Sequence, residues 1–355
     1  MKLVRNKLEK IYTGLKIAES ALLSKTPTDP KIALSAILDR RFSKPSAHKE
    51  SIDSLIFMER EDFESLKKRE EVMINNRLAA YIYKVRLARG LVLFVHGINS
   101  YSDDYYAIIQ DYFVRNGYDV FALDLSSSGR SKGIGVTSLS DGAKDVAEAV
   151  EYIRKRRDLK NLPLYMVGHS WGAYSVAASL NYVKDIKAIA CLSGFDTPLN
   201  EMISFPSKYI GVLSEITAEP LQNALKERSD KDYNLSAITG INKAKKTKVI
   251  IIQGGNDSTV RPEKGSIYSR VSEIKTKCKV VFLKEKGHAD VFLSPQSIEY
   301  LKQVNEMKNE FKKQYGTKIR KIPKEALDGF VSSFDKRMTS LLDEVVFDEI
   351  VKAFE

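Results

Sequence analysis

The chain has 355 residues, of which 43% are hydrophobic and 29% are charged, as expected for a globular protein with a sizeable core. Its net charge of +11 comes from scattered lysines without a nucleic-acid-binding motif, so we expect a solvated basic surface and no nucleic-acid partner. No apolar run is long enough to span a bilayer, and charged residues interrupt the N-terminus where a secretory signal would be continuous. We therefore expect a cytoplasmic protein without an integral membrane segment.

The chain offers few ligands for a metal ion. Its two cysteines, Cys191 and Cys278, lie in or beside apolar runs, and its four histidines show no paired spacing. This usage predicts neither a disulfide framework nor a metal site, and we expect no cofactor.

Residues 1–70 are predicted to form a helical extension. Apolar residues at spacings of three and four run from Val4 to Leu22, which indicates an amphipathic helix. Further helices are predicted over residues 31–41 and 53–70. We expect the first helix to pack on its own protein, but a dimer contact or a peripheral membrane contact stays open, and the sequence does not decide the oligomeric state.

From residue 71 onward, segments typical of strands and helices alternate. A β-hairpin is predicted first, with strands Glu71–Ile74 and Leu78–Val85. The apolar strands that follow are separated by amphipathic helices, which predicts an α/β fold: a mostly parallel sheet with helices on both faces. The later strands are predicted over residues 91–95, 118–123, 164–167, 186–192, 249–252 and 279–283, and the helices over residues 102–116, 139–156, 171–182, 262–273 and 295–313.

Two other segments stand apart from this alternation. The segment from about residue 196 to residue 247 has apolar residues at helical rather than strand-like spacing, so we expect a helical cap over the sheet. Residues 314–355 are predicted to form a C-terminal helical extension, which leaves residues 71–313 as the functional domain. Ligands of parallel sheets bind at the carboxyl ends of the strands, where we expect the site.

The most specific motif is Gly168-His169-Ser170-Trp171-Gly172, which follows an apolar strand and precedes a helix rich in small residues. Glycines are needed there because Cβ atoms would collide with the neighbouring strand and helix. Ser170 would stand at the helix N-terminus, where amide groups and the helix dipole favour a developing anion. It is our candidate nucleophile, and it requires a base and an orienting carboxylate.

Both partners are predicted to follow later strands. His288 lies in a loop after the last predicted strand and is the candidate base, whereas His48 lies in a polar loop and His169 should point away from the nucleophile. Asp257 follows the strand at residues 249–252 and is the candidate orienting acid. Asp196 is its rival.

Two backbone amides are expected to hold an oxyanion. One belongs to Trp171, directly after the nucleophile, and the other to Ile98, at the turn after the strand at residues 91–95. In this turn, Gly97 allows the sharp bend, and His96 is expected to shape the loop through hydrogen bonds rather than to transfer protons.

Four signals in this order resemble those of the α/β-hydrolases: His96-Gly97, Gly168-x-Ser170-x-Gly172, Gly254-x-x-Asp257 and Gly287-His288. The closest resemblance is to the serine aminopeptidase and monoacylglycerol lipase-like branch, also called lysophospholipase-like. It covers residues 71–312 and implies an α/β-hydrolase fold. The loop Asp124–Ser131 departs from the family pattern, because Ser126 and Ser127 replace an arginine and a glycine.

The leading hypothesis is a serine hydrolase that cleaves carboxylic esters of small molecules through an acyl-enzyme on Ser170. An aminopeptidase is an alternative, in which Glu201, Glu215 or Glu219 would hold a substrate ammonium group. A binding protein without activity is a further alternative from another class.

Overall fold

The computed structural model describes residues 51–133, 136–202, 218–229 and 231–355. The helices predicted over residues 1–24 and 31–41 lie outside the described residues, as do His48, Glu215 and residues 203–217 of the predicted cap.

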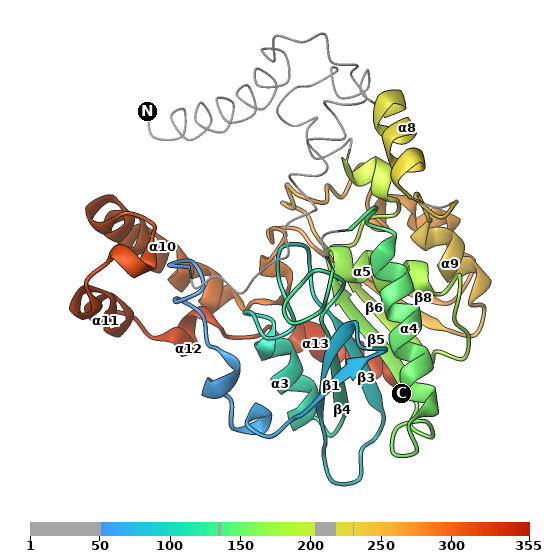
Figure 1. Ribbon diagram of the computed structural model, residues 1–355, viewed down its shortest axis with the longest axis horizontal. Helices are drawn as coiled ribbons and strands as arrows, with labels where there is room; N and C mark the ends of the chain where they lie inside the picture. The colour runs from blue at the N-terminus through green and yellow to red at the C-terminus, as the bar shows by residue number, and fades with distance from the viewer. Residues whose placement is uncertain (1–50, 134–135, 203–217, 230) are drawn as a thin grey trace.

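An eight-stranded sheet forms the centre of the molecule, with the strand order β1-β2-β4-β3-β5-β6-β7-β8 (Figure 1). Strands β1 and β2 form the predicted hairpin, β2 and β4 are antiparallel, and all later neighbours are parallel, so the mostly parallel sheet is confirmed. The strands are β1 (Glu70–Ile74), β2 (Leu78–Tyr83), β3 (Leu91–Val95), β4 (Asp119–Leu123), β5 (Leu164–His169), β6 (Ala188–Leu192), β7 (Lys248–Gly254) and β8 (Cys278–Leu283).

The central strands are apolar on both faces because both faces are covered. In β3, Leu91, Leu93 and Val95 belong to one buried cluster, while Val92 and Phe94 belong to the cluster on the opposite face. The first cluster includes residues of α4 (Asp141–Lys155), α5 (Trp171–Ser179) and α9 (Ala237–Lys243), and the second includes residues of α3 (Ala107–Arg115) and α13 (Glu344–Phe354). The predicted helical layers are thus present.

The outer strand β8 is less buried than the strands inside the sheet. It pairs only with β7 among the described strands, and Val280 and Phe282 are exposed. Phe282 stacks on Tyr268, which is part of the short helix η3 (Tyr268–Glu273).

Two predicted helices are wrong. Instead of one helix over residues 53–70, the chain forms two single 3₁₀ turns, η1 (Arg60–Asp62) and η2 (Glu64–Leu66), separated by extended backbone at Phe63. Tertiary packing overrides the helical spacing here, because Ile52, Ile56 and Leu66 are each buried in the second cluster by successive turns. The helix predicted over residues 262–273 is reduced to η3, which is kinked at Arg270.

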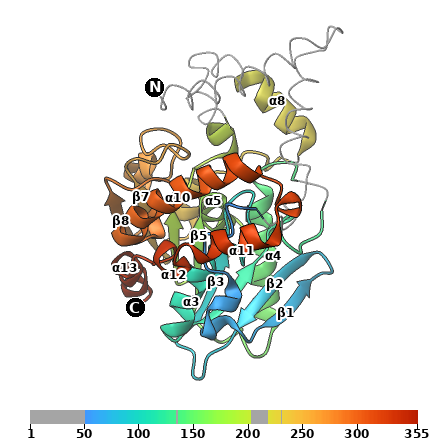
Figure 2. The same cartoon turned by 90° about the vertical axis from the view of Figure 1, so that its left-hand side faces the viewer.

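The remaining elements lie around this core. Figures 1 and 2 show α10 (Pro295–Tyr315) and α11 (Lys324–Ser332) side by side, and Phe311 stacks on Phe330 between them. Within the described residues, no helix is long and apolar enough to cross a membrane. The other short elements are α8 (Ala218–Arg228), η4 (Asp290–Phe292), η5 (Ile319–Lys321) and α12 (Lys336–Thr339).

The last helix packs on the sheet rather than beside it. Helix α13 contacts β6 and β7, and Phe354 stacks on Tyr165 of β5 with ring centroids 4.2 Å apart. Helix α9 similarly packs on α5. We therefore propose different boundaries from those expected from the sequence: the core includes α9 and α13, the cap ends before α9, and residues 295–343 form a helical excursion inserted before the last core helix.

Replacing a buried residue of α13 tests this assignment. Phe347 is fully buried and contacts Tyr112 and Phe113, so Phe347→Ala is expected to lower the free energy of unfolding by about 3–5 kcal/mol. Val345, on the same helix, is 75% exposed, and Val345→Ala is the matched control with little expected effect. Urea denaturation measures both, and equal stabilities of the two variants would refute a core role for α13.

Candidate active site

Ser170 occupies a sharp turn between β5 and α5. Its φ of 56° and ψ of −118° are unusual for a residue with a side chain, so the surrounding structure must hold it there. Its amide donates a hydrogen bond of 2.8 Å to the carbonyl of Leu192 in β6, and its own carbonyl accepts from Tyr174 as the helix begins. The serine therefore stands at the carboxyl edge of the sheet, directly before a helix N-terminus.

The two motif glycines allow this turn to pack closely. A Cβ on Gly172 would lie 2.1 Å from the carbonyl oxygen of Val95 in β3, and a Cβ on Gly168 would lie 2.3 Å from the carbonyl oxygen of Gly172. Both contacts involve backbone atoms, which side-chain rotation does not relieve. Any side chain at either position would push α5 away from the sheet.

Gly172→Ala is consequently expected to destabilise the fold by about 1–3 kcal/mol and to displace Ser170. Thermal unfolding together with the turnover of a test ester measures the two effects. Gly329→Ala is the control, because a Cβ on Gly329 in α11 would have nothing within 4 Å. A Gly172→Ala protein as stable and as active as the unmodified chain would contradict the close approach described here.

The structure brings Ser170, His288 and Asp257 together. The Nε2 atom of His288 lies 2.9 Å from Oγ of Ser170, and its Nδ1 atom lies 2.8 Å from Oδ2 of Asp257. Ser170 and Asp257 are buried, whereas the His288 side chain remains 20% exposed. This arrangement gives the imidazole one partner that can lose a proton and one that can stabilise a positive ring.

Asp257 is held by its own loop. Its Oδ1 atom accepts hydrogen bonds from the amides of Thr259 and Val260, at 2.8 and 2.9 Å. Its Oδ2 atom accepts from His288 and, at 3.3 Å, from Nε2 of Gln253. The carboxylate is thus oriented before any substrate binds.

Two amides near Ser170 are available to a ligand. Within the described residues, the amides of Ile98 and Trp171 donate no hydrogen bond. The loop that carries Ile98 lies against the serine, because a Cβ on Gly97 would be 3.4 Å from the Cβ of Ser170. Both amides are thus without an acceptor beside the serine, as expected for donors to an oxyanion.

His96 joins two loops and is fully buried. Its Nε2 atom accepts a hydrogen bond of 3.0 Å from the amide of Leu125, so its Nδ1 atom carries the proton and donates to the carbonyl of Gly97 at 2.7 Å. Burial lowers the pKa of His96, which keeps the ring neutral. Its hydrogen bonds are those of a loop-shaping residue.

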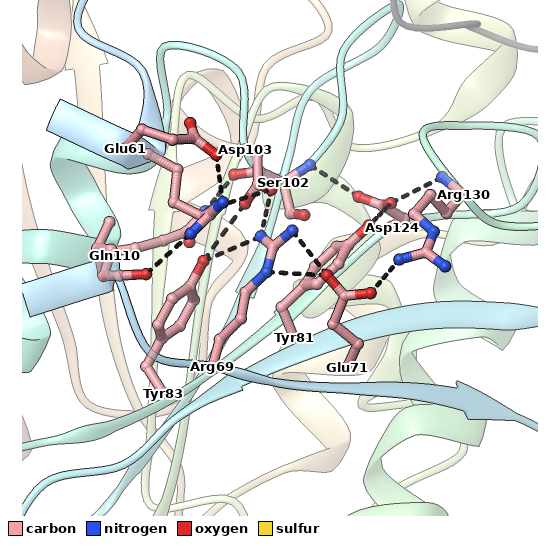
Figure 3. A network of polar contacts seen from close by, with 12 residues as sticks. Glu61, Arg69, Glu71, Tyr81, Tyr83, Ser102, Asp103, Gln110, Asp124 and Arg130 are labelled. Atoms are coloured by element: carbon pink, nitrogen blue, oxygen red, sulfur yellow. Dashed lines mark hydrogen bonds and ion pairs between the residues drawn. The ribbon is translucent and has the colours of Figure 1, made fainter. Parts of the chain in front are cut away.

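A polar network holds the rest of the loop after β3 (Figure 3). The Asp124 carboxylate accepts from the amides of Ser102 and Arg130, at 2.8 and 3.0 Å. The Asp103 carboxylate pairs with Arg69, whose guanidinium lies over the ring of Tyr81. Contacts with Asp124, which follows β4, and with the β1–β2 hairpin therefore hold this loop in place.

The unusual serine of the loop after β4 also has a partner. Both the amide and the hydroxyl of Ser126 donate to Asp145 of α4, and Arg77 completes this group by pairing with Asp145 and Glu148. The departure from the family pattern is thus accommodated by an arginine from the hairpin.

The rival acid lies outside the site. Asp196 is buried and accepts from the hydroxyl of Ser236 and the amide of Ile238, and it pairs with Arg270. These contacts connect α9 to η3, so Asp196 has a structural role. In the described part of the chain, no group of three or more His, Cys, Asp or Glu side chains is arranged to hold a metal ion.

Sequence reasoning gave no role to Tyr106 and to the ring of His169. The Tyr106 hydroxyl lies 2.9 Å from Nδ1 of His169, whose Nε2 atom lies 3.0 Å from the carbonyl oxygen of His288. A tyrosine near the start of a helix is too common for the sequence to single it out. Only the fold places it beside the serine turn.

Comparisons with known proteins found one matching family model and several similar solved structures. Residues 87–239 match the family model for serine aminopeptidase, S33. An esterase of Pyrococcus furiosus is similar in structure, with 18% identity, a TM-score of 0.51, and coverage of 75% of this chain and 96% of the esterase chain. An acylaminoacyl peptidase of Pyrococcus horikoshii shares 16% identity at a TM-score of 0.48, over 63% of this chain and 38% of the peptidase chain. A search of curated protein sequences found no match.

Proposed function

We propose that this chain, which has the fold of the α/β-hydrolase superfamily, is a serine hydrolase that cleaves carboxylic esters of small molecules. The observation that carries the proposal is the hydrogen-bonded series Ser170–His288–Asp257 at the carboxyl edge of the sheet. The family match supports the hydrolase class, and the choice of an ester is our own inference.

In the proposed reaction, Oγ of Ser170 attacks the acyl carbon while Nε2 of His288 takes the hydroxyl proton. The amides of Ile98 and Trp171 donate to the oxyanion of the tetrahedral intermediate. His288 then gives its proton to the leaving alcohol, and Asp257 stabilises the imidazolium throughout. Water, activated by His288, attacks the acyl-enzyme and releases the acid.

Labelling with a fluorophosphonate probe tests this function directly. The probe reacts with an activated serine, so we expect one equivalent to bind and peptide mass spectrometry to locate it on Ser170. Hydrolysis of short p-nitrophenyl esters is expected to stop in proportion to labelling. A protein that neither labels nor hydrolyses these esters would instead favour a hydrolase-fold binding protein.

The position of Glu201 favours an aminopeptidase as the second candidate function. Burial raises the pKa of its carboxyl to about 8, the charge of Asp257 adds to this shift and Arg261 opposes it, so Glu201 lies within electrostatic reach of the proposed site. A substrate ammonium group would favour the ionised form of this carboxyl. Assaying acyl esters beside prolyl and alanyl naphthylamides separates the two functions, and preferential cleavage of the naphthylamides would replace the ester proposal.

A further inference from the structure

His169 is buried between the two loops that flank the nucleophile. Only 1% of its surface is exposed, and its ring lies between Tyr106, Phe292 and His288, with ring centroids 5.5, 5.3 and 4.8 Å away. Tyr106 belongs to the segment after β3, while His288 and Phe292 belong to the segment after β8. The side chain of His169, next to Ser170, therefore contacts both the segment that carries the expected oxyanion amide and the segment that carries the expected base.

The partners of His169 define which ring nitrogen carries the proton. Its Nε2 atom faces a main-chain carbonyl, which only accepts, so Nε2–H donates to the oxygen of His288 at 3.0 Å. Its Nδ1 atom then accepts from the Tyr106 hydroxyl at 2.9 Å, and that hydroxyl in turn accepts from Tyr105 at 3.1 Å. The hydrogen bonds all run in one direction, from Tyr105 to the carbonyl of His288.

The hydrogen bond from His169 to the carbonyl of His288 affects the position of the His288 imidazole, the proposed base. The imidazole of His288 must satisfy two distances at once, to Ser170 and to Asp257, and its direction depends on the backbone from which it projects. Misplacement of a reacting group by about 1 Å costs up to about 100-fold in rate. We propose that His169 is a positioning residue, which fixes the main chain of His288 so that its imidazole is aligned with Ser170; this inference rests on the function proposed above.

The neutral state of His169 suits this task. Burial lowers the pKa of His169 to about 3, and the neighbouring His288 adds to the shift, so the ring stays uncharged while His288 gains a proton. A charged ring would repel the imidazolium that forms during the reaction. It would also turn Nδ1 into a donor facing the Tyr106 hydroxyl and break the direction of the series.

Three substitutions of His169 distinguish a role as hydrogen-bond donor from a role as a ring that only fills space. His169→Phe keeps a ring but removes both hydrogen bonds. His169→Gln places an amide N–H as many bonds from Cα as Nε2 of histidine, so it can donate to His288 again. His169→Asn is the matched control, because its shorter amide reaches only the position of Nδ1.

Turnover is measured per active site titrated with the fluorophosphonate probe, together with the melting temperature. We expect kcat of His169→Phe and His169→Asn to fall about 10- to 100-fold, with KM within about twofold and little change in melting temperature. His169→Gln is expected to recover most of the lost turnover. The low-field proton resonance of His288 Nδ1–H, bonded to Asp257, should broaden or disappear in the phenylalanine variant and return in the glutamine variant.

Wild-type turnover per titrated site in His169→Phe would overturn the inference. So would equal losses in all three variants that follow their melting temperatures, because that result indicates a structural role alone. If the unmodified protein neither labels nor hydrolyses esters, the proposed function fails instead. The low-field resonance still decides the positioning role in that case, since it requires no turnover.

Discussion

Ser170→Ala is expected to lower kcat for ester hydrolysis by about 10⁴- to 10⁶-fold while the protein remains folded. The substitution removes the oxygen that forms the acyl-enzyme, and among the described residues the hydroxyl of Ser170 bonds only to His288. The residual rate would come from binding and from the amides of Ile98 and Trp171. Single-turnover kinetics, far-ultraviolet circular dichroism and probe labelling measure rate, fold and nucleophile together.

Ser193→Ala provides the control for this variant. Ser193 follows β6 at the same edge of the sheet, is fully buried and also has a positive φ of 51°, but within the described residues its hydroxyl makes no hydrogen bond. We expect its loss to leave kcat unchanged. Ester hydrolysis by Ser170→Ala at the wild-type rate would show that another group is the nucleophile.

Asp257→Asn is expected to lower kcat by about 10⁴-fold with a small change in KM. The asparagine oxygen can keep the hydrogen bonds from Thr259 and Val260, so its amide N–H then faces Nδ1 of His288. That donor makes Nδ1 an acceptor and places the ring proton on Nε2. A histidine protonated at Nε2 does not take a proton from Ser170.

The matched control here is Asp196→Asn, which changes a buried aspartate that bonds to none of the three residues. It is expected to lower stability but to preserve kcat per titrated site. If Asp196→Asn causes the larger loss of kcat, the orienting acid has been assigned to the wrong loop.

The sheet was predictable because its strands are long apolar runs bounded by turn residues. Strand β3, with every residue buried, is predicted over the same five residues that the structure shows. The candidate site could be predicted as well, since parallel strands bring their carboxyl ends to one edge. The tight turn at Ser170 and the loops at Asp257 and His288 each follow such a strand.

Other features depend on contacts that spacing does not encode. Ile52, Ile56 and Leu66 are spaced like one face of a helix, yet they meet the core through separate turns. The sequence predicts the helix at residues 344–354 as part of a terminal extension, but its phenylalanines pack in the core cluster on one face of the sheet. The hydrogen bond from His169 joins residues 119 positions apart, and no local pattern predicts it.

Among the described strands, none pairs with the outer edge of β8, so its main-chain donors and acceptors form a template for unwanted strand addition. Exposed Phe282 and Val280 would strengthen such a pairing, but Lys277 and Lys284 are exposed near the two ends of this strand, while Lys279 pairs with Glu349. We expect the positive charges of Lys277 and Lys284 to disfavour the docking of a second copy along this edge, which would protect the protein against aggregation there. High ionic strength, by screening these charges, would weaken that protection.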